Sequence, residues 1–206
     1  MTKSISTNAI GLAIFAVFTA GLISITQVVT KERILENEKL YKSRLLFEIL
    51  PDADPVLVDN PISLTSARFT GLDLLSLSNP GEYYRDPKTL DMILPVVAPN
   101  GYTEAIKLLV GIDKKGSIID VRIISHRETP GLGDKIEIKK SNWIVQFQGK
   151  SLSIPSIEHW KVKKDDGYFD QLTGATVTPR AVVGAIANLL KFYQLNRELL
   201  IEVELD

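Results

Sequence analysis

The chain has 206 residues, of which 45% are hydrophobic, and a formal net charge of −1. This length and composition predict one packed globular domain with an appendage, and they exclude a large multidomain enzyme and a disordered chain. Without an excess of positive charge, no nucleic acid is expected as a partner. The chain has no cysteine and two histidines, which excludes iron–sulfur clusters and cysteine-based zinc sites, and we expect no metal site. Any redox chemistry must therefore belong to an organic cofactor.

The amino-terminal segment is apolar enough to lie in a membrane. Residues 9–29 contain no charged side chain, and a helix of about 20 residues spans the roughly 30 Å hydrocarbon core of a bilayer. We expect residues 1–30 to form a single transmembrane anchor in contact with lipid, with a cleaved secretory signal as the alternative. Basic residues are more frequent after this segment than before it, which favours a cytoplasmic domain, but the short polar head is also typical of an uncleaved export signal. The flanking charges leave the orientation open.

Residues 31–50 carry charged side chains interspersed with apolar residues that recur at helical spacing. This pattern predicts an amphipathic juxtamembrane helix, which Pro51 ends. We expect its apolar face to pack against the rest of the same chain and not against a partner protein. The apolar positions are Ile34, Leu35, Tyr41, Leu45, Leu46, Ile49 and Leu50.

Residues 51–206 are predicted to form one α+β domain. Residues 51–92 indicate loops with short strands, and residues 93–98 predict a strand in which Pro95 indicates an edge or a bulge. Residues 106–112 and 118–125 are rich in β-branched residues and are joined by a turn containing Gly116, which predicts a hairpin and an antiparallel sheet. In the second of these strands, apolar residues alternate with Asp120 and Arg122, so we expect one face to be buried and the other to face water.

The carboxyl-terminal segment predicts a helix from about Pro179 to Leu195, with Thr178 as its N-cap. The preceding turn, residues 170–178, reads DQLTGATVT. Unpaired N–H groups and the positive end of the dipole make a helix amino terminus a ready phosphate site, to which Thr173, Thr176 and Thr178 can offer hydroxyl groups. Spacing alone favours an ordinary polar turn with an N-cap.

A second segment, residues 126–135, reads HRETPGLGDK and directly follows the hairpin. Its glycines and proline fix a turn, and polar groups from His126, Glu128 and Thr129 lie at a strand end, where binding sites are common. With Leu132 as an apolar wall, this mixture suits a flat heteroaromatic ligand. On composition, an ordinary surface turn is an equally good interpretation.

Together, the two segments resemble known signatures. Asp170, Thr173, Gly174, Ala175, Thr176 and Thr178 match the D-x-x-[ST]-G-A-T-x-[ST] pattern of FMN-binding domains whose flavin is attached through a threonine phosphoester, and residues 126–136 resemble the second signature of that domain. The anchor, the GYTEAIKLLVGID run at residues 101–113 and the WKVKK run at residues 160–164 extend the resemblance to the G subunits of Rnf-type ion-translocating electron transport complexes.

This resemblance implies a membrane-anchored electron carrier with FMN linked covalently to Thr176 by a flavin transferase. It implies recognition by the transferase at Asp170 and phosphate contacts from Thr178. The residues that it places around the isoalloxazine are Glu128, Thr129, Gly131, Leu132 and, as a weaker candidate, His126. It further implies an inner-membrane location with the domain outside the cytoplasm, which conflicts with the count of flanking charges, and other membrane subunits as partners.

No catalytic acid, base or nucleophile is expected, because the cofactor does the redox chemistry and the protein positions and tunes it. Electron flow between ferredoxin or nicotinamide pools, coupled to ion movement, is implied by the resemblance alone. Two alternatives stay open. One is the related C subunit of sodium-translocating NADH:quinone reductases, which shares the threonine motif. The other is a flavin-free anchored binding or scaffold module.

Overall fold

The computed structural model describes residues 2–78 and 81–202. The chain divides into two compact units, Met1–Arg44 and Leu45–Asp206. The second unit therefore begins before residue 51, where the sequence predicted the domain to start. The reason is that Leu45, Leu46, Ile49 and Leu50 pack against the sheet of the second unit.

The first unit consists of most of one long helix, α1 (Thr2–Ile49), so the predicted anchor and juxtamembrane helix form one continuous element. Within the described residues, α1 is the one helix long and apolar enough to cross a membrane, by length and composition, and its most apolar window has a mean hydropathy of 2.2. Large side chains such as Leu12, Phe18 and Val28 are exposed around its circumference. Such a surface suits an apolar environment.

Three threonine hydroxyl groups of α1 are paired within the helix. Thr19 and Thr26 each donate to the backbone carbonyl four residues earlier, at 2.9 and 2.8 Å, and Thr30 donates to that of Thr26 at 2.8 Å. An unpaired hydroxyl in hydrocarbon is costly, so this pairing makes the threonines compatible with a membrane-spanning helix.

The last turn of α1 belongs to the second unit, where Leu45, Leu46, Ile49 and Leu50 are buried. They form an apolar cluster with residues of the sheet, including Ile93 and Leu109. The prediction that this helix packs on its own chain is therefore confirmed for residues 45–50. It is wrong for the earlier apolar positions, since Ile34, Leu35 and Tyr41 are exposed.

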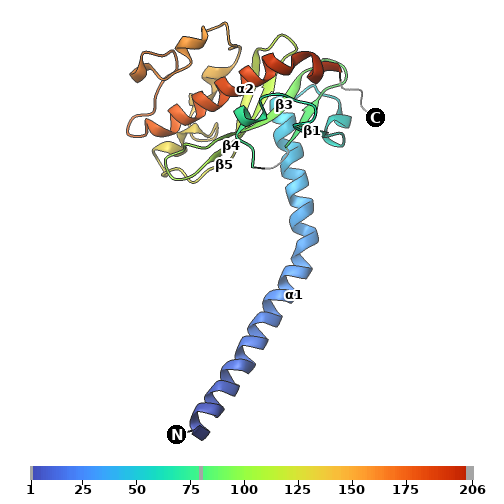
Figure 1. The fold of residues 1–206 in the computed structure, drawn as a ribbon, viewed down its shortest axis with the longest axis vertical. Helices are drawn as coiled ribbons and strands as arrows, with labels where there is room; N and C mark the ends of the chain where they lie inside the picture. Colours follow the sequence, from blue (N-terminus) through green and yellow to red (C-terminus); the bar gives the residue numbers. More distant parts are fainter. Residues whose placement is uncertain (1, 79–80, 203–206) are drawn as a thin grey trace. The chain divides into compact units, whose positions relative to one another are not determined.

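The second unit is built on a five-stranded antiparallel sheet in which the strands follow one another in chain order, β1-β2-β3-β4-β5 (Figure 1). The strands are β1 (Ile62–Ser63), β2 (Glu82–Arg85), β3 (Met92–Ala98), β4 (Ile106–Ile112) and β5 (Ile118–Ser125). The predicted α+β class, the hairpin and the short strands before it are confirmed. Pro95 lies on the middle strand, but β2 pairs only with Met92 and Ile93, so at Pro95 the partner strand is β4 alone. The missing N–H of proline is tolerated at such a position.

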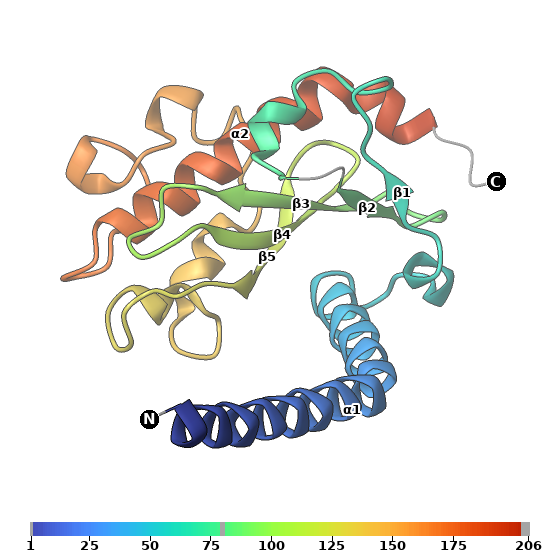
Figure 2. The ribbon, with the colours of Figure 1, turned by 60° about the horizontal axis from the view of Figure 1, so that its bottom comes forward.

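Both faces of the sheet are covered (Figure 2). Helix α2 (Val177–Glu202) packs on the face that carries Leu94, Leu108 and Val121. The other face carries Asp120 and Arg122, and the prediction that it faces water is wrong because the end of α1 covers it. Asp120 is only 7% exposed, and Arg122 forms ion pairs with Asp120 at 2.6 Å and with Glu48 of α1 at 3.3 Å.

Helix α2 is confirmed as a helix, but it begins at Val177 and ends at Glu202, beyond the predicted limits at both ends. Thr176 therefore holds the N-cap position, and its carbonyl accepts a hydrogen bond from the Arg180 N–H at 3.3 Å. The prediction that Thr178 is the N-cap is wrong. Thr178 and Pro179 lie in the first turn, where proline removes an N–H group that has no helical partner.

The β4–β5 turn gives a test of the fold. Gly116 has φ +90° and donates its N–H to the Asp113 carbonyl at 2.9 Å, so Gly116→Ala places a side chain in a strained conformation. We expect it to lower the free energy of unfolding by about 1 kcal/mol. Gly184→Ala, inside α2 with open space around its Cβ, is the matched change and should raise this free energy by about 0.5–1 kcal/mol. Denaturant unfolding of both variants measures the two effects, and a stabilising Gly116→Ala would contradict the turn geometry.

Candidate functional site

A cavity of about 300 Å³ opens at the amino-terminal end of α2. Three separate segments form it: the loop after β3, the loop after β5 and the turn that leads into α2. The predicted residues Glu128, Thr129, Leu132, Gly174, Ala175, Thr176 and Thr178 line it, together with Tyr102, Gly133 and Val177. The structure therefore brings both sequence segments to one place.

One end of the cavity is suited to a phosphate group. Thr176 holds the N-cap position and is half-buried, with Gly174 exposed beside it at φ +80°. The N–H groups of Val177 and Thr178 belong to the first turn of α2 and have no partner within the helix. Together with the helix dipole they form a donor set of the kind that binds phosphate oxygens.

The rest of the cavity has apolar walls. Tyr102 is 69% exposed, and Leu132 and Val177 are also exposed although they are large and apolar. An aromatic ring and two aliphatic side chains around an open cavity give contact surfaces for a flat ring system. The donor set and these walls together fit a phosphorylated heteroaromatic ligand such as FMN.

Glu128 is the charged residue of the lining, and only 4% of it is exposed. One carboxylate oxygen accepts the backbone N–H of Thr103 at 3.2 Å, and the other accepts the hydroxyl of Thr178. A hydroxyl has a single hydrogen, so the Thr178 side chain donates it to Glu128 and only its backbone N–H remains for a phosphate oxygen. This bond also explains why Thr178, inside the helix, is 1% exposed.

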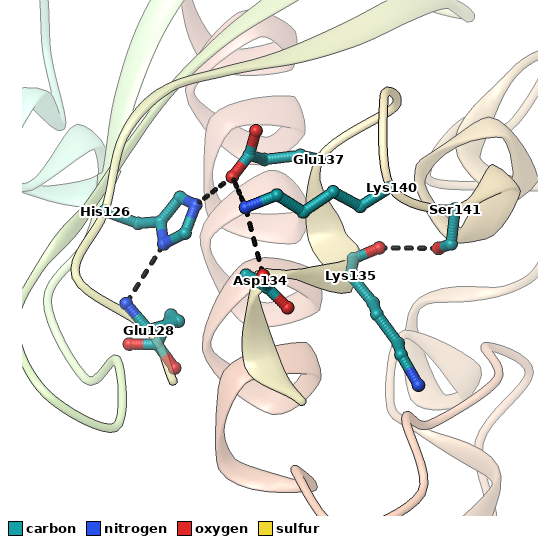
Figure 3. Close-up of polar contacts among 7 residues, drawn as sticks. All are labelled: His126, Glu128, Asp134, Lys135, Glu137, Lys140 and Ser141. Carbon is teal, nitrogen blue, oxygen red and sulfur yellow. Dashed lines mark hydrogen bonds and ion pairs between the residues drawn. The ribbon is translucent and has the colours of Figure 1, made fainter. Parts of the chain in front are cut away.

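His126 does not line the cavity but contacts the backbone of Glu128, which does (Figure 3). Its Nδ1 accepts the backbone N–H of Glu128 at 3.0 Å, and its Nε2 lies 2.8 Å from a carboxylate oxygen of Glu137. His126, the weaker candidate for contact with a ring system, therefore holds the backbone of Glu128, which is in the lining.

Lys140 joins two carboxylates next to this histidine. Its Nζ lies 2.7 Å from Glu137 and 3.0 Å from Asp134 (Figure 3). The hydrogen bond from Lys140 lowers the pKa of the Asp134 carboxyl, and the hydrogen bonds from Lys140 and then from His126 lower the pKa of Glu137. The same two carboxylates raise the pKa of Lys140.

These shifts give a pH dependence of stability. A carboxyl group whose pKa is lower in the folded state stabilises the fold at pH above its unfolded value, and this contribution is lost as the pH falls through the folded pKa. We therefore expect the free energy of unfolding to decrease on acidification below the ordinary values of 3.8 and 4.5 for Asp134 and Glu137. Lys140→Met should be less stable than wild type at pH 6, and its free energy of unfolding should decrease less on acidification. Urea unfolding from pH 6 to pH 3 measures both effects. The exposed neighbour Lys139 provides the control variant Lys139→Met, and equal pH profiles for all three proteins would contradict this assignment.

The remaining predicted residues lie outside the lining. Gly131 forms the turn before Leu132 with φ +76°, and Thr173 and Asp170 are exposed. Asp170 pairs with Lys163 at 2.6 Å, and its carbonyl accepts the indole N–H of Trp143 at 2.6 Å. These contacts hold the start of the threonine turn, while the Asp170 side chain stays exposed.

Three lining residues were missed as contact candidates: Tyr102, Gly133 and Val177. Tyr102 is part of the 101–113 run that carried the resemblance, and Gly133 belongs to the second segment. A Cβ at Gly133 would lie 2.8 Å from the Thr178 hydroxyl oxygen and 3.0 Å from the Glu128 side chain, so a close approach explains this glycine. In the part of the chain that the structure describes, no group of acidic or histidine side chains is arranged to hold a metal ion.

An antiparallel sheet with a phosphate-type site at the start of its packed helix, preceded by a long apolar helix, defines this chain as an FMN-binding domain protein with an apolar amino-terminal helix. The FMN-binding domain family matches residues 101–191, and the family described as RnfG N-terminal region matches residues 1–49. Similar proteins share nearly the full length. The G subunit of the ion-translocating oxidoreductase complex from Vibrio vulnificus (strain YJ016) is 40% identical over 100% of this chain and 97% of its own length. The G subunits of Pseudomonas aeruginosa (strain UCBPP-PA14) and Shewanella loihica are 41% and 39% identical, over 98% of this chain and 94% and 95% of their own lengths. The chain belongs to the RnfG family, the G subunits of these complexes.

Proposed function

We propose that this chain is the membrane-anchored electron-carrier subunit of an ion-translocating electron transport complex, with FMN bound covalently through Thr176. The observation that carries the proposal is the place of Thr176. The residue lines the cavity at the N-cap position of α2, next to the N–H groups of the first helical turn, which have no partner within the helix. The family and the named relatives support the wider assignment.

The proposed linkage is a phosphoester of the Thr176 hydroxyl oxygen. A flavin transferase that uses FAD forms the bond from this oxygen to the phosphorus of the FMN part, while the bond from that phosphorus to the AMP part breaks and the hydroxyl proton is lost. Gly174 is exposed and Thr176 only half-buried, so the transferase has access to the acceptor oxygen. The N–H groups of Val177 and Thr178 then hold phosphate oxygens.

Bound FMN supplies the redox chemistry by accepting and releasing electrons. The chain contributes binding and orientation: Tyr102, Leu132 and Val177 provide apolar contacts, and the buried carboxylate of Glu128 is a negative group in the cavity wall. A covalent link prevents loss of the cofactor in a compartment where free flavin is dilute. Nothing in this arrangement requires an acid or base that acts on a diffusing substrate.

Intact mass spectrometry of the chain, purified from cells that express the transferase, tests the proposal. We expect an FMN phosphoester adduct that survives denaturation, on a proteolytic peptide that contains Thr176. Wild-type protein with the unmodified mass in such cells would refute the covalent linkage.

The location forms a separate part of the proposal. We place α1 in the inner membrane with residues 45–206 on the extracytoplasmic side, and the other subunits of the complex as neighbours. In spheroplasts, added protease should degrade this domain while cytoplasmic proteins stay intact. A domain that is cleaved only after lysis would favour the opposite orientation, which the flanking basic residues indicate.

A further inference from the structure

The ring of His126 connects the cavity wall to a charged cluster. Its Nδ1 accepts the N–H of Glu128 at 3.0 Å, and its Nε2 lies 2.8 Å from Glu137 (Figure 3). A backbone N–H can only donate, so Nδ1 must be the nitrogen without a proton, and Nε2–H donates to the Glu137 carboxylate. The contacts therefore select the neutral ring with its hydrogen on Nε2.

A cluster of charged groups lies next to the ring. The groups that face it are the carboxylates of Glu137 and Asp134 and the ammonium group of Lys140. Lys140 binds the same carboxylate oxygen of Glu137 as the ring does, at 2.7 Å, and so helps to fix the acceptor of Nε2–H. A second proton would sit on Nδ1 and remove the acceptor for the Glu128 N–H.

Glu128 in turn contacts the two other segments that form the cavity. Its carboxylate accepts the Thr103 N–H, next to Tyr102, and the Thr178 hydroxyl, two residues after Thr176. Little space is left for Glu128 to move, because a Cβ on Gly133 would already lie 3.0 Å from it. A displaced Glu128 backbone would therefore disturb the contacts that join all three segments.

We propose that His126 is a positioning residue for the cofactor cavity, which as the neutral ring holds Glu128 and, through it, the Tyr102 loop and the start of α2. This inference rests on the proposed function, because its readout is the flavin attached to Thr176. It assigns to His126 no contact with the cofactor itself.

Two variants of the full-length protein separate the roles of the two ring nitrogens. In His126→Asn, the amide oxygen can accept the Glu128 N–H as in an Asx turn, although the contact with Glu137 is lost. In His126→Gln, the longer amide can reach Glu137 but the acceptor at the Nδ1 position is lost. We expect His126→Asn to keep the visible circular dichroism of the attached flavin and His126→Gln to reduce its amplitude at least twofold, at equal flavin content by intact mass.

His159→Gln is the matched control, because the His159 ring contacts Ser156 at 3.0 Å and does not line the cavity. It should leave the signal unchanged. An unchanged signal in His126→Gln, or an equal loss in both His126 variants, would overturn the positioning role while the adduct at Thr176 still stands. Wild-type protein without the adduct would overturn the proposed function and this inference with it.

If His126→Gln does not fold, judged by thermal unfolding, His126→Ala tests the same inference. Alanine removes the acceptor for the Glu128 N–H without adding a longer side chain. We expect the visible circular dichroism of His126→Ala to be at least twofold weaker than that of His126→Asn, at equal flavin content by intact mass. Equal signals from these two variants would overturn the proposal.

Discussion

Thr176→Ala is expected to leave the chain without covalently bound flavin. A phosphoester needs a hydroxyl oxygen, and alanine has none. The fold should persist, because the residue is half-buried and the loss of a threonine at an N-cap position costs about 1 kcal/mol. A denaturing gel under ultraviolet light should show a fluorescent wild-type band and a dark variant band. The intact masses should differ by the adduct in addition to the change from threonine to alanine.

Three further variants make this experiment specific. Thr176→Ser keeps a hydroxyl at the same position and should retain detectable attachment. Thr173→Ala changes an exposed threonine outside the cavity lining and should be modified as fully as wild type. Thr178→Ala should also be modified, since its hydroxyl is donated to Glu128. Full fluorescence in Thr176→Ala, or its loss in Thr178→Ala alone, would show that a different threonine carries the flavin.

Local sequence patterns were enough to predict the hairpin and the helix that carry this site. The β4 and β5 limits agree with the predicted ranges, because β-branched runs and the Gly116 turn act within a few residues. The helix start was predicted two residues late. Thr178 was taken as the N-cap on its residue type, whereas its hydroxyl bonds to Glu128, which is 50 residues away in sequence. Such a partner cannot be read from local spacing.

Contacts between residues far apart in the sequence also explain why the exposure of β5 was predicted wrongly. Alternation in β5 indicated a solvent-facing side for Asp120 and Arg122, but Glu48 and the apolar end of α1 cover them from more than 70 positions earlier in the chain. Tyr102 was likewise not assigned to the site, although Thr103 next to it donates to Glu128. The two motif segments contained most of the cavity lining, while the tertiary contacts that hold them together became visible only in the fold.

A domain that begins at residue 45 is expected to be much more stable than one that begins at residue 51. The shorter form lacks Leu45, Leu46, Ile49 and Leu50, which are buried against the sheet. At about 1.5–3 kcal/mol for each buried side chain, their removal should cost several kcal/mol, a large share of the stability of a domain of this size. It would also expose Tyr84, Ile93 and Leu109 to water. Urea unfolding of the two forms measures the difference, and equal midpoints would show that the end of α1 adds nothing to the core.

Point variants in the full chain test the packing of residues 45–50 without truncation. Leu46 is fully buried, so Leu46→Ala should lower the free energy of unfolding by about 2–5 kcal/mol through lost burial and a cavity. Leu40 lies earlier in the same helix and is exposed, so Leu40→Ala should change the free energy of unfolding by no more than about 0.5 kcal/mol. If both variants unfold as wild type, the packing of residues 45–50 on the sheet is refuted. If only Leu46→Ala is destabilised, the helix that begins in the apolar amino-terminal segment also completes the core of the second unit.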